Sequence, residues 1–198
     1  MPLRPRRKEP TVQPIVQSTV EPIVFIDVDG VLNPLGKLQD GYTVHRITLA
    51  EKGRRRQYQV ALNPTHGAAL LALAETTGAQ LVWGTTWSQH ANPKIGPRIG
   101  LPELPWVDIG HRPRSGPDSR LTVGQWKAKK LAAWAARRPF VWLEDEPDAA
   151  AALAELDGVG PHQVITVDAL RGLTAQHLQA ARDWLDQLRA DLVPPTTP

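Results

Sequence analysis

The chain of 198 residues contains no cysteine. This absence excludes a disulfide framework and any thiolate metal site, so metal chemistry has to rest on oxygen or imidazole ligands. The sequence also lacks any apolar run near the ~20 residues that cross a bilayer, and residues 1–19 have no uninterrupted apolar core like that of a signal peptide. We therefore expect a cytoplasmic protein that is neither exported nor bound to a membrane.

An excess of one charge is also lacking. The net charge is +3, and residues 1–21 supply +2 of it through four basic side chains against two acidic ones. The rest of the chain is therefore nearly neutral, and its composition does not require a strongly basic face. Binding to a polyanion would have to rest on local clusters of charge.

Length and composition favour one folded domain. A chain of this size with 41% hydrophobic residues can bury one good core, whereas two domains would be cramped. Residues 1–21 hold four prolines among charged and polar residues, and residues 194–198 have a similar composition. We expect both segments to be disordered tails around a domain of residues 22–193.

Short apolar runs alternate with helix-like segments along this domain. The runs suit strands covered on both faces and comprise residues 23–27, 81–84, 140–143 and 164–167. The expected helices comprise residues 64–76, 122–137, 147–156 and 174–191. Alternation of this kind predicts an α/β fold, with a parallel sheet between two layers of helices.

Two regions depart from the alternation. Residues 42–49 and 57–62 have strand-like composition and are separated by the charged residues 51–56, which predicts a projecting hairpin. Residues 93–120 are rich in Gly and Pro and predict a long ordered loop with a short strand at residues 106–109. About thirty residues separate Asp29 from the helix at Pro64, which leaves room for a hairpin but not for a full cap domain.

The most informative stretch is Ile23–Leu32, where an apolar run ends in Asp27 and Asp29, followed by Gly30. In an open α/β sheet, ligands bind beyond the carboxyl ends of the strands. Two neighbouring carboxylates repel each other, and a divalent cation would compensate their charge; hard oxygen ligands suit Mg2+. An Asp-x-Asp-Gly turn also occurs in calcium loops and ordinary turns, so the other motifs have to decide.

Polar residues also follow the later predicted strands. Thr85 and Thr86 follow residues 81–84, while Glu144-Asp145-Glu146 follows residues 140–143. Lys127 lies near the beginning of the helix that precedes this second acidic cluster. Taken singly, a Thr-Thr pair often caps a turn and a lysine often lies on a solvated helix face.

In order and position, these four motifs resemble those of the haloacid dehalogenase-like (HAD) superfamily. The resemblance covers residues 25–146 and begins with Asp27-Val28-Asp29-Gly30-Val31. It looks closest to small actinobacterial HAD-domain proteins and to the HAD domains of RNA repair proteins. The family implies a three-layer Rossmannoid fold, with the expected hairpin as a flap after the first strand and no full cap domain.

The resemblance further implies a Mg2+-dependent phosphohydrolase that works through an aspartyl-phosphate. Asp27 is then the expected nucleophile, and Asp29 the group that protonates the leaving oxygen and later activates water. Thr85 is the better candidate for binding the phosphoryl group, with Thr86 as the alternative. Lys127 would bind the same group and offset the negative charge around it.

The family pattern also implies a set of Mg2+ ligands: the carboxylates of Asp27 and Asp145 and the backbone carbonyl of Asp29. Glu144 stands where HAD proteins more often have an aspartate. We expect Glu144 to pair with Lys127 or to join the outer coordination shell of Mg2+, although its longer side chain could also reach the ion. Asp148 is either a further outer-shell acid or the cap of the next helix.

The sequence indicates less about the identity of the substrate. An uncapped site admits large substrates, and Arg54, Arg55 and Arg56 at the expected hairpin tip favour a phosphate on a nucleic-acid end or a phosphoprotein. Trp87 and Trp126 flank site residues and could stack on a base, although packing is the commoner use. A competing hypothesis is a non-catalytic module that binds a polyanion through the basic N-terminal tail; the intact Asp27 and Asp29 argue against it.

Overall fold

The computed structural model describes residues 20–51 and 54–192. Both predicted tails, apart from residues 20 and 21, lie outside the described residues. A parallel sheet has the strand order β4-β1-β5-β6. Its strands are β1 (Ile23–Ile26), β4 (Gln80–Trp83), β5 (Phe140–Glu144) and β6 (His162–Thr166).

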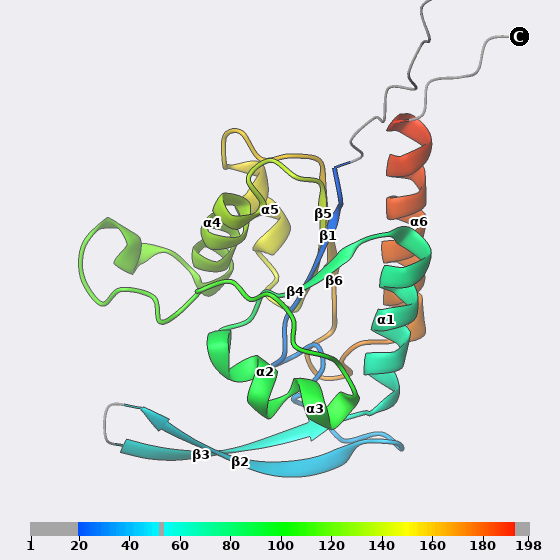
Figure 1. Ribbon diagram of the computed structural model, residues 1–198. Coiled ribbons are helices and arrows are strands. Elements are labelled where there is room, and N and C mark those ends of the chain that lie inside the picture. The colour runs from blue at the N-terminus through cyan, green and yellow to red at the C-terminus, as the bar shows by residue number, and fades with distance from the viewer. Residues whose placement is uncertain (1–19, 52–53, 193–198) are drawn as a thin grey trace, which may run out of the picture.

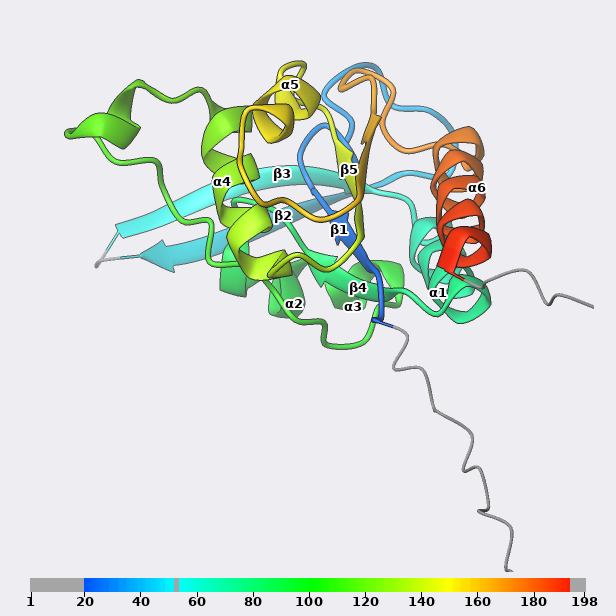
Figure 2. The same cartoon turned by 90° about the horizontal axis from the view of Figure 1, so that it is seen from above.

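Helices cover both faces of this sheet (Figures 1 and 2). Helices α1 (Thr65–Thr77) and α6 (Ala175–Leu192) lie on one face, and α4 (Val123–Ala135) and α5 (Ala149–Ala154) lie on the other. The predicted three-layer α/β fold is therefore confirmed. Among the described residues, no helix combines the length and apolarity that crossing a bilayer requires.

Strand β1 has no exposed face because the core lies on both sides of it. Val24 and Ile26 pack in the cluster beneath α1 and α6, whereas Ile23 and Phe25 pack beneath α4 and α5. All four side chains are fully buried. This arrangement explains why the strand is a continuous apolar run rather than an alternating one.

The register of the sheet brings three strand ends to one level. Ile26, the last residue of β1, pairs with Trp83 on one side and with Leu143 on the other. The residues that follow, Asp27, Gly84 and Glu144, therefore emerge together at the carboxyl edge. The fold thus places the predicted motifs at a common rim.

The predicted hairpin is present as β2 (Thr43–Glu51) and β3 (Arg54–Leu62), and it runs across the end of the molecule below the sheet (Figure 1). The prediction that residues 51–56 connect the two strands is wrong. Arg55 and Arg56 belong to β3, where they pair with Ala50 and Leu49 of β2. Charged side chains are compatible with strand here because Arg55 and Arg56 are exposed to solvent.

The predicted loop at residues 93–120 is wrong in part. After η1 (Ser88–His90), the chain forms the short helices α2 (Ala91–Lys94), which runs into this region, and α3 (Gly96–Ile99), and later η2 (Pro117–Arg120). Pro97 lies in the first turn of α3, where a proline is tolerated, and Ile95 and Ile99 are buried. The predicted strand at residues 106–109 reduces to a bridge between Trp106 and Trp83.

Candidate active site

The tight turn at Gly30, which follows Asp29, packs against the acidic end of β5. Gly30 has φ +78°, a left-handed conformation that other residues adopt at a cost. A Cβ atom on Gly30 would lie 2.2 Å from Cγ of Asp145. Only a glycine leaves room for the Asp145 side chain against this turn, so the two acidic motifs lie in direct contact.

Lys127 connects the two acidic motifs through charge. Its Nζ atom lies 2.7 Å from Oδ2 of Asp27 and 2.5 Å from Oε2 of Glu144, and the lysine is only 2% exposed. Burial alone would lower the pKa of Lys127, but the two carboxylates outweigh this effect and raise it. The ammonium group is therefore charged across the physiological pH range.

Lys127 is buried on α4, and the first turn of this helix is held in place by hydrogen bonds. Thr122 and Gln125 form a capping box, in which each side chain binds the backbone N–H of the other residue. The hydroxyl of Thr122 also donates to Asp148, which braces the helix against the loop after β5. Asp148 stands at the N-cap position of α5 as predicted, but its side chain forms no capping hydrogen bond with that helix.

Glu144 is fully buried, and its two oxygens have different partners. Oε1 accepts hydrogen bonds of 3.1 Å from the backbone N–H groups of Asp145 and Glu146, while Oε2 forms the ion pair with Lys127. Burial raises the pKa of Glu144, and its partners oppose this rise. The structure thus pairs Glu144 with Lys127.

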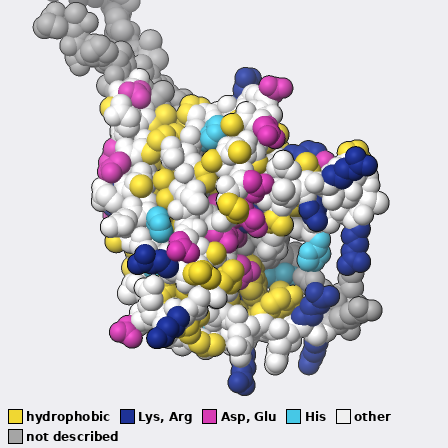
Figure 3. Space-filling view, turned by 180° about the vertical axis from the view of Figure 1, so that it is seen from behind, with side chains coloured by type: hydrophobic (Ala, Val, Ile, Leu, Met, Phe, Trp, Pro, Cys, Tyr) yellow, Lys and Arg dark blue, Asp and Glu magenta, His cyan; other side chains and the backbone are white. Residues whose placement is uncertain are grey.

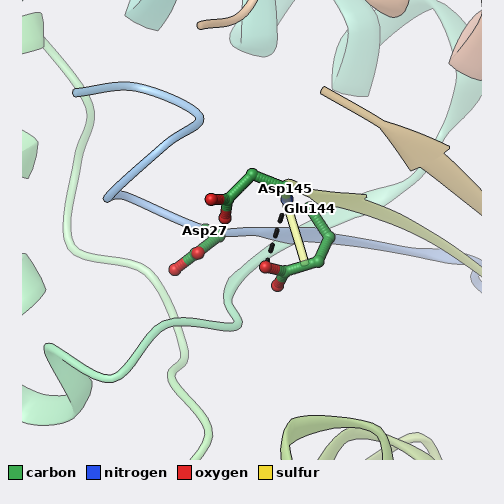
Figure 4. A group of neighbouring side chains, drawn as sticks. All are labelled: Asp27, Glu144 and Asp145. Carbon is green, nitrogen blue, oxygen red and sulfur yellow. Dashed lines mark hydrogen bonds between the residues drawn. The ribbon is translucent and has the colours of Figure 1, made fainter. Parts of the chain in front are cut away.

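Three carboxylates converge at the rim of the sheet: Asp27, Glu144 and Asp145 each offer an oxygen within 4.8 Å of the others. Figure 4 shows the carboxylates of Asp27 and Asp145 directed to the same side, while that of Glu144 turns back toward its own strand. Burial raises the pKa of Asp145, as expected for a carboxyl group without full compensation. A hard divalent cation fits this oxygen donor set, with Asp27 and Asp145 as the better-directed ligands.

Asp29 points elsewhere and is not among the three clustered carboxylates. Its Oδ1 accepts a 2.8 Å hydrogen bond from Nδ2 of Asn33, and its Oδ2 accepts a 2.9 Å bond from Nε1 of Trp87. Burial raises the pKa of Asp29, while both hydrogen bonds oppose the rise. The sequence singled out Trp87 only for packing or stacking, and nothing in it indicated the bond to Asp29.

The two candidate threonines differ in burial. Thr85 is fully buried, and its hydroxyl oxygen accepts a hydrogen bond from the backbone N–H of Trp87, whereas Thr86 is exposed. Trp126 donates its indole N–H to the carbonyl oxygen of Ile109, which is a packing role. The structure therefore favours Thr85 over Thr86 as part of an ordered site.

The surroundings of the site combine both signs of charge. Figure 3 shows acidic side chains gathered near the middle of one face, beside a hollow. Basic side chains lie on the far side of this hollow, toward the hairpin and the η2 segment. Side chains of both signs therefore border the hollow.

Comparisons with known proteins agree with this geometry. No curated protein matches the chain. Residues 23–178 match a family described as "HAD domain in Swiss Army Knife RNA repair proteins". The match runs from the first residue of β1 into α6 and includes every candidate site residue. A HAD domain of this kind indicates activity of the phosphatase or hydrolase type. The chain therefore belongs to the family of HAD domains of Swiss Army Knife RNA repair proteins.

Proposed function

We propose that this protein is a Mg2+-dependent phosphatase that forms an aspartyl-phosphate on Asp27. The observation that carries the proposal is the buried contact of Asp27 with Lys127, beside the carboxylate of Asp145. A nucleophilic carboxylate must approach an anionic phosphoryl group, and positive charge at that point reduces the repulsion. Asp29 lies two residues away with its carboxylate held separately, as an acid-base group requires.

In the first half of the reaction, an oxygen of Asp27 attacks phosphorus in line. The bond from phosphorus to the leaving oxygen breaks, and that oxygen keeps the electron pair and takes a proton from Asp29. In the second half, water attacks the phosphorus of the aspartyl-phosphate and gives a proton to Asp29, while the bond from phosphorus to the Asp27 oxygen breaks and that oxygen keeps the electron pair. The products are inorganic phosphate and the free carboxylate of Asp27.

The remaining residues hold the phosphoryl group and the metal. Asp27, Asp145 and the backbone carbonyl of Asp29 would hold Mg2+, which supplies positive charge to the phosphoryl oxygens. Lys127 and the hydroxyl of Thr85 would bind the same group of oxygens. Glu144 serves to fix Lys127, because both of its oxygens already have partners.

Release of phosphate from p-nitrophenyl phosphate, with and without Mg2+, tests this proposal. We expect activity in the presence of Mg2+ and none in Asp27→Asn, which keeps the shape of the side chain. Full activity in that variant would eliminate Asp27 as the nucleophile. Mg2+ should raise the melting temperature of the wild type and of Asp118→Asn, a matched acid that pairs with Lys129 at the surface, but raise that of Asp145→Asn much less.

The proposed substrate is a phosphate at a nucleic-acid end. The family of RNA repair domains, the absence of a cap domain from the described residues and the basic hairpin support this choice. Oligonucleotides with 3′- or 5′-phosphates should be hydrolysed faster than nucleotides, sugar phosphates or a phosphopeptide. Equal rates on the small compounds would reject a nucleic-acid substrate, and preference for the phosphopeptide would indicate a phosphoprotein instead.

The competing interaction module makes the opposite prediction. Deletion of residues 1–21, which we propose to lie outside the folded domain of residues 22–193, would then abolish binding to a polyanion. Phosphatase assays would stay at background for every variant. The phosphatase proposal instead expects this deletion to leave the hydrolysis of p-nitrophenyl phosphate intact.

A further inference from the structure

The carboxylate of Asp29 is held on both sides by side chains from different parts of the chain. Asn33 belongs to the same loop, whereas Trp87 follows β4 and is 58 positions away. Each donor binds a different oxygen, so together they fix both the position and the plane of the carboxylate. Each oxygen retains a lone pair, which leaves the group able to carry or accept a proton.

Both donors are themselves supported by strand β3 of the hairpin. The amide oxygen of Asn33 accepts a 2.8 Å hydrogen bond from the backbone N–H of Ala61, which also fixes the orientation of its amide. The indole of Trp87 contacts the ring of Tyr58, with ring centroids 5.5 Å apart. Asn33 and Trp87 are 7% and 6% exposed, so neither is free to turn away.

We infer that Trp87 and Asn33 are positioning residues for the acid-base step, and that the hairpin acts on catalysis through them. The inference rests on the proposed phosphatase function. If the pair served only to fill space, a hydrogen-bond donor at each oxygen of one carboxylate would not be needed. The indole N–H of Trp87 instead aims at the single group that must deliver a proton to the leaving oxygen.

The chemistry of that proton makes the inference testable. When the bond from phosphorus to the leaving oxygen breaks, an alkyl leaving group takes the electron pair as a strongly basic alkoxide and needs the proton of Asp29. p-Nitrophenolate is a stable anion and needs that proton far less. Misplacement of Asp29 should therefore slow the first half of the reaction selectively for an alkyl phosphate, whereas general damage to the site slows it for both substrates. The attack of water in the second half is common to both substrates and does not enter kcat/KM when formation of the aspartyl-phosphate is irreversible.

The test compares kcat/KM on p-nitrophenyl phosphate with kcat/KM on an alkyl phosphate, either glycerol 2-phosphate or a phosphorylated oligonucleotide, whichever the wild type hydrolyses faster. Trp87→Phe keeps a ring against Tyr58 but removes the N–H. We expect it to lower the alkyl rate at least about tenfold more than the p-nitrophenyl rate, since general acids contribute factors of about a hundred or more. Trp126→Phe is the matched control: it removes an indole N–H bound to a backbone carbonyl and should leave the ratio of the two rates unchanged.

Asn33→Ala gives an independent reading if Trp87→Phe folds poorly, and it should shift the ratio in the same direction. Both variants should keep the rise in melting temperature on adding Mg2+, because Asp27 and Asp145 are untouched. An equal loss on both substrates would overturn the inference while leaving Asp27-dependent phosphatase activity in place. Absence of Asp27-dependent phosphate release in the wild type would instead reject the proposed function itself.

Discussion

The ammonium group of Lys127 lies 2.7 Å from the carboxylate of Asp27, although 100 positions of sequence separate the two residues. Both side chains are almost fully buried. Burying a charge without a partner is costly, so this pair and Glu144 have to be assembled together. The candidate active site is thus also part of the core, and several substitutions should affect stability and activity in different proportions.

Replacing Lys127 by Met should destabilise the fold strongly. The variant leaves the carboxylates of Asp27 and Glu144 buried without their cation, and loss of one partner of a buried pair costs about 3–5 kcal/mol. Urea unfolding in EDTA measures the change in the free energy of unfolding. Lys129→Met is the matched control, because Lys129 pairs with Asp118 at the surface and should cost no more than about 1 kcal/mol. Similar values for the two variants would contradict a buried charge network.

Replacing Gly30 by Ala should disturb the proposed metal ligand Asp145. The new Cβ would have both a strained φ of +78° and a clash at 2.2 Å with Cγ of Asp145. Gly100→Ala separates these two effects, since Gly100 has φ +76° and no atom within 4 Å of the place that a Cβ would take. We expect Gly100→Ala to cost about 1–2 kcal/mol from strain alone, and Gly30→Ala to cost more and to weaken the Mg2+-induced rise in melting temperature. Equal losses of stability with unchanged response to Mg2+ would show that the contact with Asp145 is unimportant.

Two adjacent arginines of the hairpin should differ in their effect on a nucleic-acid substrate. Side chains alternate along a strand, so Arg56 lies on the same face as Tyr58, which contacts Trp87 at the site, while Arg55 lies on the opposite face. Arg56→Gln should raise KM for a phosphorylated oligonucleotide and reduce the slope of log binding constant against log salt by about 1. Arg55→Gln should change neither. Equal effects of the two substitutions would mean that the hairpin offers no preferred face to the substrate.

His66 should make stability depend on pH. It is buried at 9% exposure against the ring of Tyr42, and burial lowers its pKa below the ordinary 6.5. Below pH 6.5 the unfolded chain therefore takes up a proton that the folded protein resists, and stability falls as pH decreases toward the lowered value. Urea unfolding of wild type and His66→Gln between about pH 5 and 8 measures this effect. The difference between the two free energies of unfolding should vary with pH below the ordinary pKa and be constant above it.

Local sequence patterns were enough to predict the strands and helices that carry the site. Runs such as Ile23–Ile26 and Phe140–Glu144 are apolar almost throughout because both faces of the sheet are covered, and that pattern is local. The capping signal of Thr122 is equally local. The acidic groups at the strand ends were therefore predictable, and so was their meeting at one edge of a parallel sheet.

The hairpin and the Gly- and Pro-rich region were predicted less well for a physical reason. Charged residues such as Arg55 and Arg56 are compatible with either a turn or an exposed strand, and only cross-strand pairing decides between the two. Short helices such as α3 have too few residues for a periodic pattern. Their formation depends on burial of single residues such as Ile99.

The pairing of the polar groups, in contrast, depends on the packing of segments that are distant in the sequence. The sequence offered Glu144 either to the metal or to Lys127, and the distance of 2.5 Å between their charged atoms decides for the lysine. It gave no sign that Trp87 would donate to Asp29, because a hydrogen bond across 58 positions depends on the course of two loops and not on any local pattern. Residue types at strand ends are fixed by the chain, whereas the partner of each buried charge is fixed by which segments the packed sheet brings within reach.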